Sequence, residues 1–299
     1  MDYEDVITRA AAFGAVADAT DAAGDGAAAE AAVEARWQLI RELHQTTDRD
    51  AFEAVVAAAE SDDRARRLVG LNALGQIGYQ ADRPYLEETL PVLLDAVGEQ
   101  DAEAVAAAVA ALGDVADPRG LPAVLQHVGH ADDAVRFSVA LALRALTDSD
   151  EPAADVTAAL IALTRDPDPD VRELATLVLG TRLHADGPEV REALAARLDD
   201  EYDEAVEQAV MGLARRGDPR GTAPLLNELW HMVDDVSILS ETEVFGVAAI
   251  AGTKDMLPPL RQLWQRRDSF EPSDRRMLAE ALALLGDLVD PVELVEPES

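Results

Sequence analysis

The sequence predicts an all-α solenoid built from helix pairs stacked one on the next. The first observation is a repeated phrase: VAALGDVADPRGLPAVL at 109–125 returns as VMGLARRGDPRGTAPLL at 210–226, and LLGDLVDP at 284–291 repeats its middle part. Such self-similarity is the signature of a repeat architecture. The second is composition, because only 4% of the residues are aromatic while alanine, leucine and valine dominate. That composition suits close helix packing and disfavours sheets.

The spacing of the repeated phrase gives the number of units. Corresponding leucines stand at positions 74, 112, 143, 179, 213 and 285, separated by 38, 31, 36, 34 and 72 residues. The last interval fits two repeats, so the chain contains about seven helix pairs. Each unit has the pattern helix, short turn, helix, for example 169–183 followed by 188–198.

The stretch RDPDPDVRELATLVLG at 165–180 shows how one helix ends and the next begins. Proline lacks a backbone N–H and fits a turn or the first position of a helix. Asp168 or Asp170 can cap the N–H groups that follow. The apolar residues from Val171 onward then recur at helical spacing, and Gly180 lies near the helix end.

The two ends of the chain differ from the repeats. Residues 1–33 form an acidic, alanine- and glycine-rich segment without a second apolar stripe, which predicts a short helix followed by a partly mobile linker. Alternatively, its alanines extend the next helix. The solenoid is expected over 34–290, with a longer loop at 231–243, and the acidic tail 291–299 is expected to fray.

Charge and composition exclude several classes of function. The chain has 59 acidic against 25 basic residues, a net charge of −34, which disfavours nucleic acid and anionic membranes and favours a basic protein partner. It has no cysteine and hence no disulfide or thiolate nucleophile. Since there is neither a basic leader nor a run of 18 apolar residues, we expect a cytoplasmic protein.

The sequence contains no pattern that requires an enzyme. His127 and His130 are one turn apart, but Gly129 is expected to end that helix between them, so no metal site is predicted. Acid pairs such as Asp132 and Asp133 fall between helices, where carboxylates cap N-termini. No phosphate loop, dinucleotide fingerprint or nucleophile elbow occurs. We therefore expect no catalytic residue, no cofactor and no enzymatic activity.

The segments DPDPDVRELATLVLG, VREALAARL and DPRGLPAVL resemble HEAT repeats, in particular the short bacterial type found in phycobilisome-lyase-like proteins. The resemblance covers residues 35–290 and implies a right-handed solenoid whose Val-Arg helices line the concave face. It also implies that the arginine of each such helix reaches an acid of a neighbouring repeat. Arg136 and Arg172 match that position, Arg67 matches by alignment, and Arg172 is expected in a partly buried pair. No residues match a bilin-handling motif.

Working from the leucine spacing, we predict a protein-binding stripe along the concave face. Its positions are Val69, Asn72, Ala107, Ala110, Ser138, Leu141, Leu174, Leu177, Gln208 and Met211. The stripe is small and uncharged with larger apolar residues at its centre, as in the core of an interface. Alternatively, Leu174 and Leu177 are buried against the next repeat. Arg182, Arg215 and Arg216, at the ends of these helices, either fix a partner's carboxylate or complement the helix dipoles.

The leading functional hypothesis is a non-enzymatic protein-binding scaffold or adaptor that uses the concave face of the solenoid. One alternative is an acidic inhibitor or immunity-type protein that neutralises a basic protein. The other is a lyase-like modifier of small molecules, which requires a deep pocket with converging polar groups.

Overall fold

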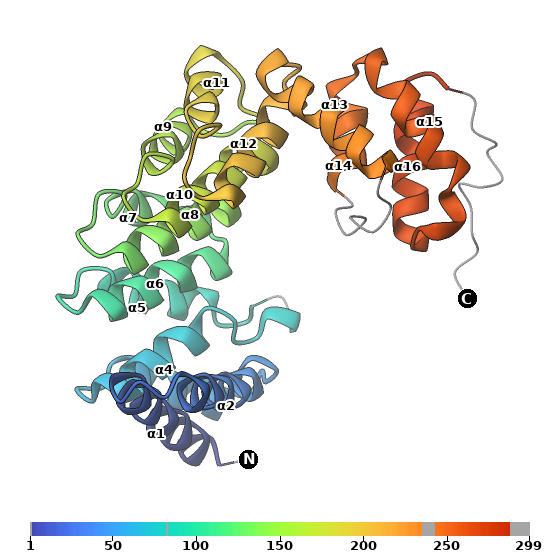
Figure 1. Cartoon of the computed structure of the whole chain (residues 1–299). Helices are drawn as coiled ribbons and strands as arrows, with labels where there is room; N and C mark the ends of the chain where they lie inside the picture. Colours follow the sequence, from blue (N-terminus) through green and yellow to red (C-terminus); the bar gives the residue numbers. More distant parts are fainter. Residues whose placement is uncertain (1, 82, 235–242, 288–299) are drawn as a thin grey trace. The chain divides into compact units, whose positions relative to one another are not determined.

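The computed structural model describes residues 2–81, 83–234 and 243–287 (Figure 1). All regular structure in these residues is helical, as the sequence predicts. The helices group into two compact units, unit 1 (Met1–Thr147) and unit 2 (Asp148–Ser299). None of the helices in the described ranges combines the length and hydrophobicity needed to span a bilayer.

From α3 onward, the described helices alternate as seven pairs. Unit 1 contains α1 (Tyr3–Ala22), α2 (Gly26–His44), α3 (Arg49–Ala59), α4 (Arg64–Leu74), α5 (Leu86–Ala96), α6 (Ala102–Val115), α7 (Leu121–Leu125) and α8 (Asp133–Leu146). Unit 2 contains α9 (Ala154–Leu163), α10 (Pro169–Leu177), α11 (Pro188–Ala195), α12 (Asp203–Arg215), α13 (Pro219–Asp234), α14 (Glu243–Ala251), α15 (Leu257–Gln265) and α16 (Pro272–Leu284). A π-helical turn, η3 (Val178–Arg182), continues α10, and the single-turn helices are η1 (Tyr79–Ala81), η2 (Pro118–Gly120), η5 (Lys254–Met256) and η6 (Arg267–Ser269).

The second helices of the pairs form one layer in each unit, which we call the even-numbered layer. In unit 1, α4 packs against α6 and α6 against α8; in unit 2, α10 packs against α12, α12 against α14 and α14 against α16 (Figure 1). The first helices of the pairs form the odd-numbered layer. Each unit is therefore a stack of helix pairs, the α-solenoid that the sequence predicts.

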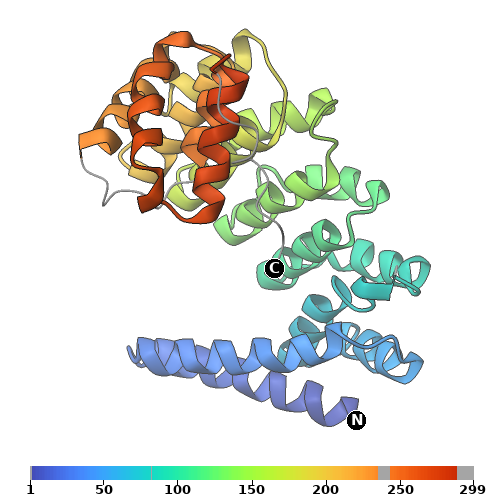
Figure 2. The same ribbon diagram turned by 90° about the vertical axis from the view of Figure 1, so that its right-hand side faces the viewer.

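The N-terminal segment differs from the short helix and linker of the prediction, whereas α2 does include alanines of this segment, as the alternative interpretation has it. Instead of a short helix and a linker, α1 and α2 form an antiparallel hairpin (Figure 2), joined by a turn at Gly24 (φ 77°) and capped by the Asp25 side chain. Val6, Ile7 and Ala10 are buried, and α1 packs on α4 as well as on α2. Alanines spaced three or four apart let helices approach closely, and a search for large apolar residues overlooks them.

Two further predictions concern the loop at 231–243 and the C-terminal tail. Within the loop expected at 231–243, residues 231–234 instead complete α13, while 235–242 lie outside the described residues. The expected acidic tail, 291–299, also lies outside them.

Aspartates begin many of the helices, as the opening stretch predicts. Asp168 stands before Pro169, the first residue of α10, and its Oδ1 accepts the backbone N–H of Val171 at 3.0 Å. Asp63 caps α4 and Asp132 caps α8 in the same way. The acid pairs between helices therefore satisfy backbone N–H groups that have no partner within the helix.

The repeated DPRG phrase forms the same arrangement twice. In the first copy, Asp117 accepts hydrogen bonds from the backbone N–H and the guanidinium of Arg119, which also pairs with Glu87 at 2.9 Å. The second copy, 218–221, repeats these contacts with Glu192 as the outer partner. In both copies the arginine thus ties the turn to the first helix of the repeat before it, α5 in the first copy and α11 in the second.

The glycines next to the repeated leucines mark where successive even-numbered helices touch. A Cβ built on Gly75 would lie 2.9 Å from Ala111 Cα, and one on Gly113 would lie 2.7 Å from Ala142 Cα. In unit 2, a Cβ on Gly212 would lie 2.6 Å from Gly180 Cα. Only a hydrogen fits at these contacts, so the glycines set the separation of the helices.

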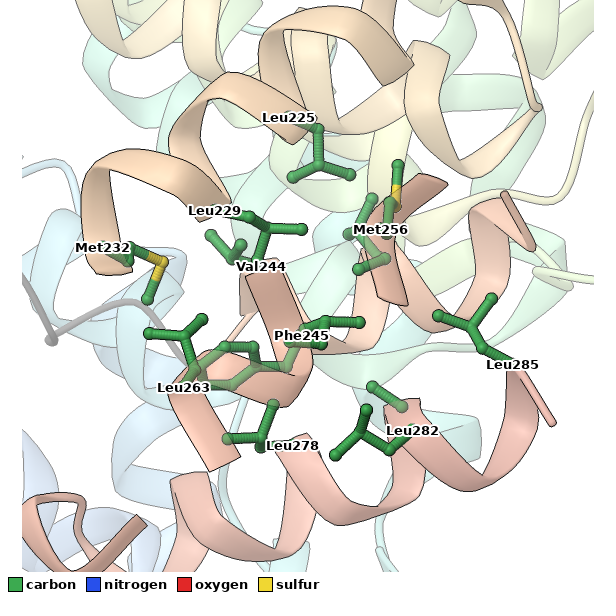
Figure 3. Packing of buried hydrophobic residues seen from close by; sticks show 14 of the residues in the cluster. Leu225, Leu229, Met232, Val244, Phe245, Met256, Leu263, Leu278, Leu282 and Leu285 are labelled. Atoms are coloured by element: carbon green, nitrogen blue, oxygen red, sulfur yellow. The ribbon is translucent and has the colours of Figure 1, made fainter. Parts of the chain in front are cut away.

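A continuous hydrophobic core joins α12 to α16. Figure 3 shows Leu225 and Leu229 of α13 pointing toward Val244 and Phe245 of α14, and Phe245 packs edge-on against Phe270 with ring centroids 5.9 Å apart. The last two repeats therefore have a well-filled core although their sequence is the least regular.

Two partly buried arginines, Arg172 and Arg216, hold neighbouring repeats together in different ways. Arg172 pairs with Asp200 of the next repeat and also donates to the carbonyls of Asp166 and Pro167, so the prediction of a partly buried pair is confirmed. Arg216 donates only to backbone carbonyls at the end of α10 and α12, those of Leu179, Gly180, Leu183, Ala185 and Gly212, at 2.7 to 3.1 Å. Burial lowers the pKa of Arg216 to about 10, which leaves the group charged at neutral pH.

Candidate protein-binding surface

In unit 1, the predicted stripe is only partly exposed. Val69 is fully buried, Ser138 is buried, and Asn72 is half-buried with its Nδ2 donating to the carbonyl of Leu68 at 2.6 Å. Ala107 is buried and Ala110 half-buried. Leu141 is the clear exception, since 39% of it is exposed. These outcomes correct the prediction for Val69, Ser138 and Ala107, which belong to the packing of α4, α6 and α8.

A residue that the prediction missed lies beside Leu141. Phe137 is one turn earlier on α8 and 37% exposed. Because residues four apart lie on the same side of a helix, Phe137 and Leu141 form an exposed apolar pair on α8. The exposed face of α8 therefore contains Phe137 and Leu141, where the prediction placed Ser138 and Leu141.

Unit 2 likewise differs from the predicted stripe. Leu174 is buried, which confirms the alternative interpretation for that residue, whereas Leu177 is half-buried. Gln208 is half-buried, and its Oε1 is inaccessible to solvent and has no hydrogen-bond partner. Met211 belongs to the core that joins α12 to α16. The surface instead carries acids, with Asp170, Glu204 and Glu207 exposed and Glu173 half-buried.

A groove opens between α12, α13 and α14, with a volume of about 410 Å³. It is lined by Asp203, Glu204, Val206, Glu207, Val210, Met211, Pro224, Leu225, Glu228 and Val244. Five of these residues are aliphatic side chains or methionine, four are carboxylates, and none of the described lining residues is Lys, Arg or His. Met211 is therefore both a core residue and part of the groove wall. We call this feature the α12–α14 groove.

The electrostatic environment beside the groove is negative. Burial, followed by the nearby carboxylates of Asp170 and Glu204, raises the pKa of Glu173. The carboxylate of Glu204 is also the main reason why the pKa of Tyr202 is raised. The shift of Tyr202 reports the negative charge at the start of α12, whereas the shift of Glu173 reports mainly its burial.

Two of the three arginines in the prediction lie at the ends of these helices. Arg182 is exposed at the last residue of η3, and Arg215 is half-buried at the last residue of α12. Neither lines the α12–α14 groove. Leu177 and Gln208 do not line it either, so Met211 is the one residue of the predicted stripe among the described lining of this groove.

The histidine pair is arranged as part of a turn. The rings of His127 and His130 are 5.9 Å apart, and Nδ1 of His130 accepts the backbone N–H of Asp132 at 3.1 Å. Burial, with a smaller contribution from His130, lowers the pKa of His127. Within the described residues, no three His, Asp or Glu side chains are grouped so that they could hold a metal ion.

Comparisons with known proteins agree on the repeat architecture. The family model described as HEAT repeats matches residues 90–160 and 156–239, which together are half of the chain. Among solved structures, the chain is similar to the Escherichia coli protein YibA, with 22% identity and a TM-score of 0.60 over 84% of this chain and 86% of that one. It is also similar to an engineered protein, with 16% identity and a TM-score of 0.50 over 95% and 89% of the two chains.

The phycocyanin lyase complex of CpcE and CpcF from Nostoc is a more distant structural match. It has 18% identity and a TM-score of 0.45, over 85% of this chain and 90% of that one. A search of the curated proteins finds no match to this sequence. At these identities the structural likeness shows the fold alone.

Proposed function

Because the chain belongs to the HEAT-repeat family, we propose that it is a non-enzymatic scaffold or adaptor that holds a protein partner on its even-numbered layer. Stacking of the repeats buries one side of each even-numbered helix and leaves another side exposed to solvent. An extended open surface of this kind suits a protein ligand.

The exposed pair on α8 is the observation that carries the proposal. Phe137 and Leu141 are large apolar residues, 37% and 39% exposed, at adjacent turns of one helix. Neighbouring positions on that face are filled by smaller or charged residues, including Ala134, Ala145 and Arg144. Two large apolar side chains framed by such residues match the composition of an interface centre with its polar rim.

A substitution at Leu141 tests the proposal. We would express tagged wild-type chain, Leu141→Asp and Val33→Asp in the native host, capture bound proteins and identify them by mass spectrometry. Val33 is a matched control because it is 43% exposed in the same unit but lies on α2, outside the stack of α4, α6 and α8. Leu141→Asp should lose the captured protein while its melting temperature stays near that of the wild type. Equal capture by all three chains would contradict the proposal.

A second candidate is an acidic inhibitor that neutralises a basic protein, and the four carboxylates around the α12–α14 groove favour it. The two candidates differ in their response to salt. Attraction between charges is screened over about 10 Å at 0.1 M salt, whereas contact through Phe137 and Leu141 is not weakened in this way. Release of the captured protein by salt alone would therefore favour the inhibitor.

A further inference from the structure

The α12–α14 groove combines an apolar wall with an acidic edge. Its wall contains Val206, Val210 and Leu225, which offer apolar contact, and its edge carries Glu204, Glu207 and Glu228. The volume of about 410 Å³ lies in the range of pockets that enclose a ligand. A ligand that matches both features needs an apolar centre and positive charges around it.

We propose that the α12–α14 groove binds a short segment of a protein partner in which one or two aliphatic residues are flanked by Lys or Arg. This inference rests on the proposed function, and it names the chemistry of the partner at one place on the surface. The aliphatic side chains contact Val206, Val210 and Met211, and the flanking cations pair with the carboxylates of Glu204 and Glu228.

Charge complementarity selects this ligand over the alternatives. The described lining contains four carboxylates and no basic residue, so an acidic peptide, a nucleic acid or an anionic lipid would be repelled. The carboxyl groups of Asp170, which is exposed, and Glu173, which is half-buried, add further acidic residues on α10.

The apolar wall distinguishes a peptide from a simple cation. A polyamine satisfies the carboxylates, but its thin methylene segments cover less of Val206, Val210 and Leu225 than a leucine side chain does, so it should bind more weakly than the peptide. Lys and Arg side chains carry apolar stems as well as charge, so a basic segment covers the wall and reaches the edge at once.

A labelled synthetic peptide, Arg-Lys-Leu-Leu-Arg-Lys, provides the probe, with its binding to the full-length chain followed by fluorescence anisotropy at low and moderate salt. The test variant is E204Q/E228Q, which removes two carboxylates from the groove. The control variant is E151Q/E189Q, which removes two exposed carboxylates of unit 2 that do not line it. Both variants change the net charge equally, so a difference between them reports local contact.

We expect E204Q/E228Q to weaken peptide binding about tenfold, and E151Q/E189Q to weaken it less than about twofold. A peptide with both leucines replaced by serine should also bind about tenfold more weakly. Equal weakening by the two variants, equal binding of the two peptides, or displacement of the peptide by spermine at equal concentration would each overturn the inference. If the peptide test fails while Leu141→Asp still loses its captured protein, the scaffold proposal stands without this groove. If the peptide binds as expected while Leu141→Asp still captures the same protein as the wild type, the groove proposal stands and the scaffold proposal for α8 is contradicted.

Discussion

Arg172 of α10 and Asp200, which precedes α12, form a bidentate ion pair, with Nε and Nη2 of Arg172 at 3.0 and 2.8 Å from the two carboxylate oxygens. The Asp200 side chain is 2% exposed and that of Arg172 is 15% exposed. Asp200 also accepts from Arg197 at 2.7 Å and from the backbone N–H of Tyr202 at 3.1 Å. The guanidinium of Arg172 is the main reason why the pKa of Asp200 is lowered.

Substitution of Arg172 by alanine should therefore destabilise unit 2. The change leaves a buried carboxylate with one arginine in place of two, and we expect a loss of roughly 2–3 kcal/mol in the free energy of unfolding, measured with urea. Arg276→Ala serves as the control, because its pair with Glu280 is 65% and 56% exposed at 3.9 Å and should contribute nothing measurable. Equal effects of the two substitutions would show that the Arg172 pair is not desolvated.

Leu174 and Leu177 should respond differently to the same substitution. Leu174 is 6% exposed, so Leu174→Asp buries an unpaired charge and should cost several kcal/mol, about 3 or more. Leu177 is half-buried, and Leu177→Asp can turn its carboxylate toward water, so the loss should be clearly smaller. Urea unfolding of the two variants and the wild type measures both losses in the free energy of unfolding. A larger loss for Leu177→Asp than for Leu174→Asp would contradict the assignment of Leu177 to the more exposed side of α10.

Glu173 should make unit 2 less stable at neutral pH than at acid pH. Its pKa in the folded state is raised above the ordinary 4.5, by burial first and then by Asp170 and Glu204. The protonated form is thus favoured by folding, and its contribution to stability is present below the unfolded pKa and is lost as the pH rises through the folded pKa.

Replacing Glu173 by glutamine removes that loss. We expect Glu173→Gln to unfold at a higher urea concentration than the wild type at about pH 7, with the difference shrinking toward about pH 4. Glu189→Gln, at an exposed position of α11, changes the net charge equally and serves as the control. A gain that is the same at both pH values would mean that the carboxylate of Glu173 is not perturbed by its neighbours.

Gly212 should not tolerate even one added methyl group. A Cβ at this position would lie 2.6 Å from Gly180 Cα, a backbone atom that cannot move aside alone, so Gly212→Ala should cost about 1–3 kcal/mol. At Gly246 of α14 the nearest atom is Met277 Cε at 3.4 Å, the end of a flexible side chain. Gly246→Ala should be neutral or stabilising, since alanine favours a helix. Calorimetric melting of both variants compares the two glycines.

The sequence predicts local features of the repeats well because local chemistry determines them. Pro169 and Asp168 mark the start of α10 through a missing N–H and a capping carboxylate, and both effects act within four residues. The pairing of Arg172 with an acid follows from the stacking of repeats, which places Asp200 of the next repeat beside the guanidinium of Arg172. The α1–α2 hairpin was missed because its contacts use alanine, whose pattern differs little from that of a biased linker.

The candidate surface was harder to predict because it depends on the rotation of each helix. Leu174 and Leu177 are three residues apart and lie on neighbouring parts of one helix face, yet Leu174 is buried and Leu177 is half-buried, so the boundary between buried and exposed residues runs between them. A shift of one position exchanges Glu173 for Leu174 and changes the surface from apolar to acidic. The α12–α14 groove also requires three helices to meet. Its sequence signal is the alternation of acids with Val206 and Val210 along α12.

The contacts of Arg216 mean that lysine cannot replace arginine at this position. Its guanidinium reaches five backbone carbonyls at once, and a guanidinium has five N–H donors whereas an ammonium has three. A lysine there would leave carbonyls at the end of α10 without a donor, and no other natural side chain has the required reach and number of donors. The sequence contains a single lysine, Lys254, against many arginines. At position 216, that preference is a requirement of the fold and would persist whatever the codon usage of the host.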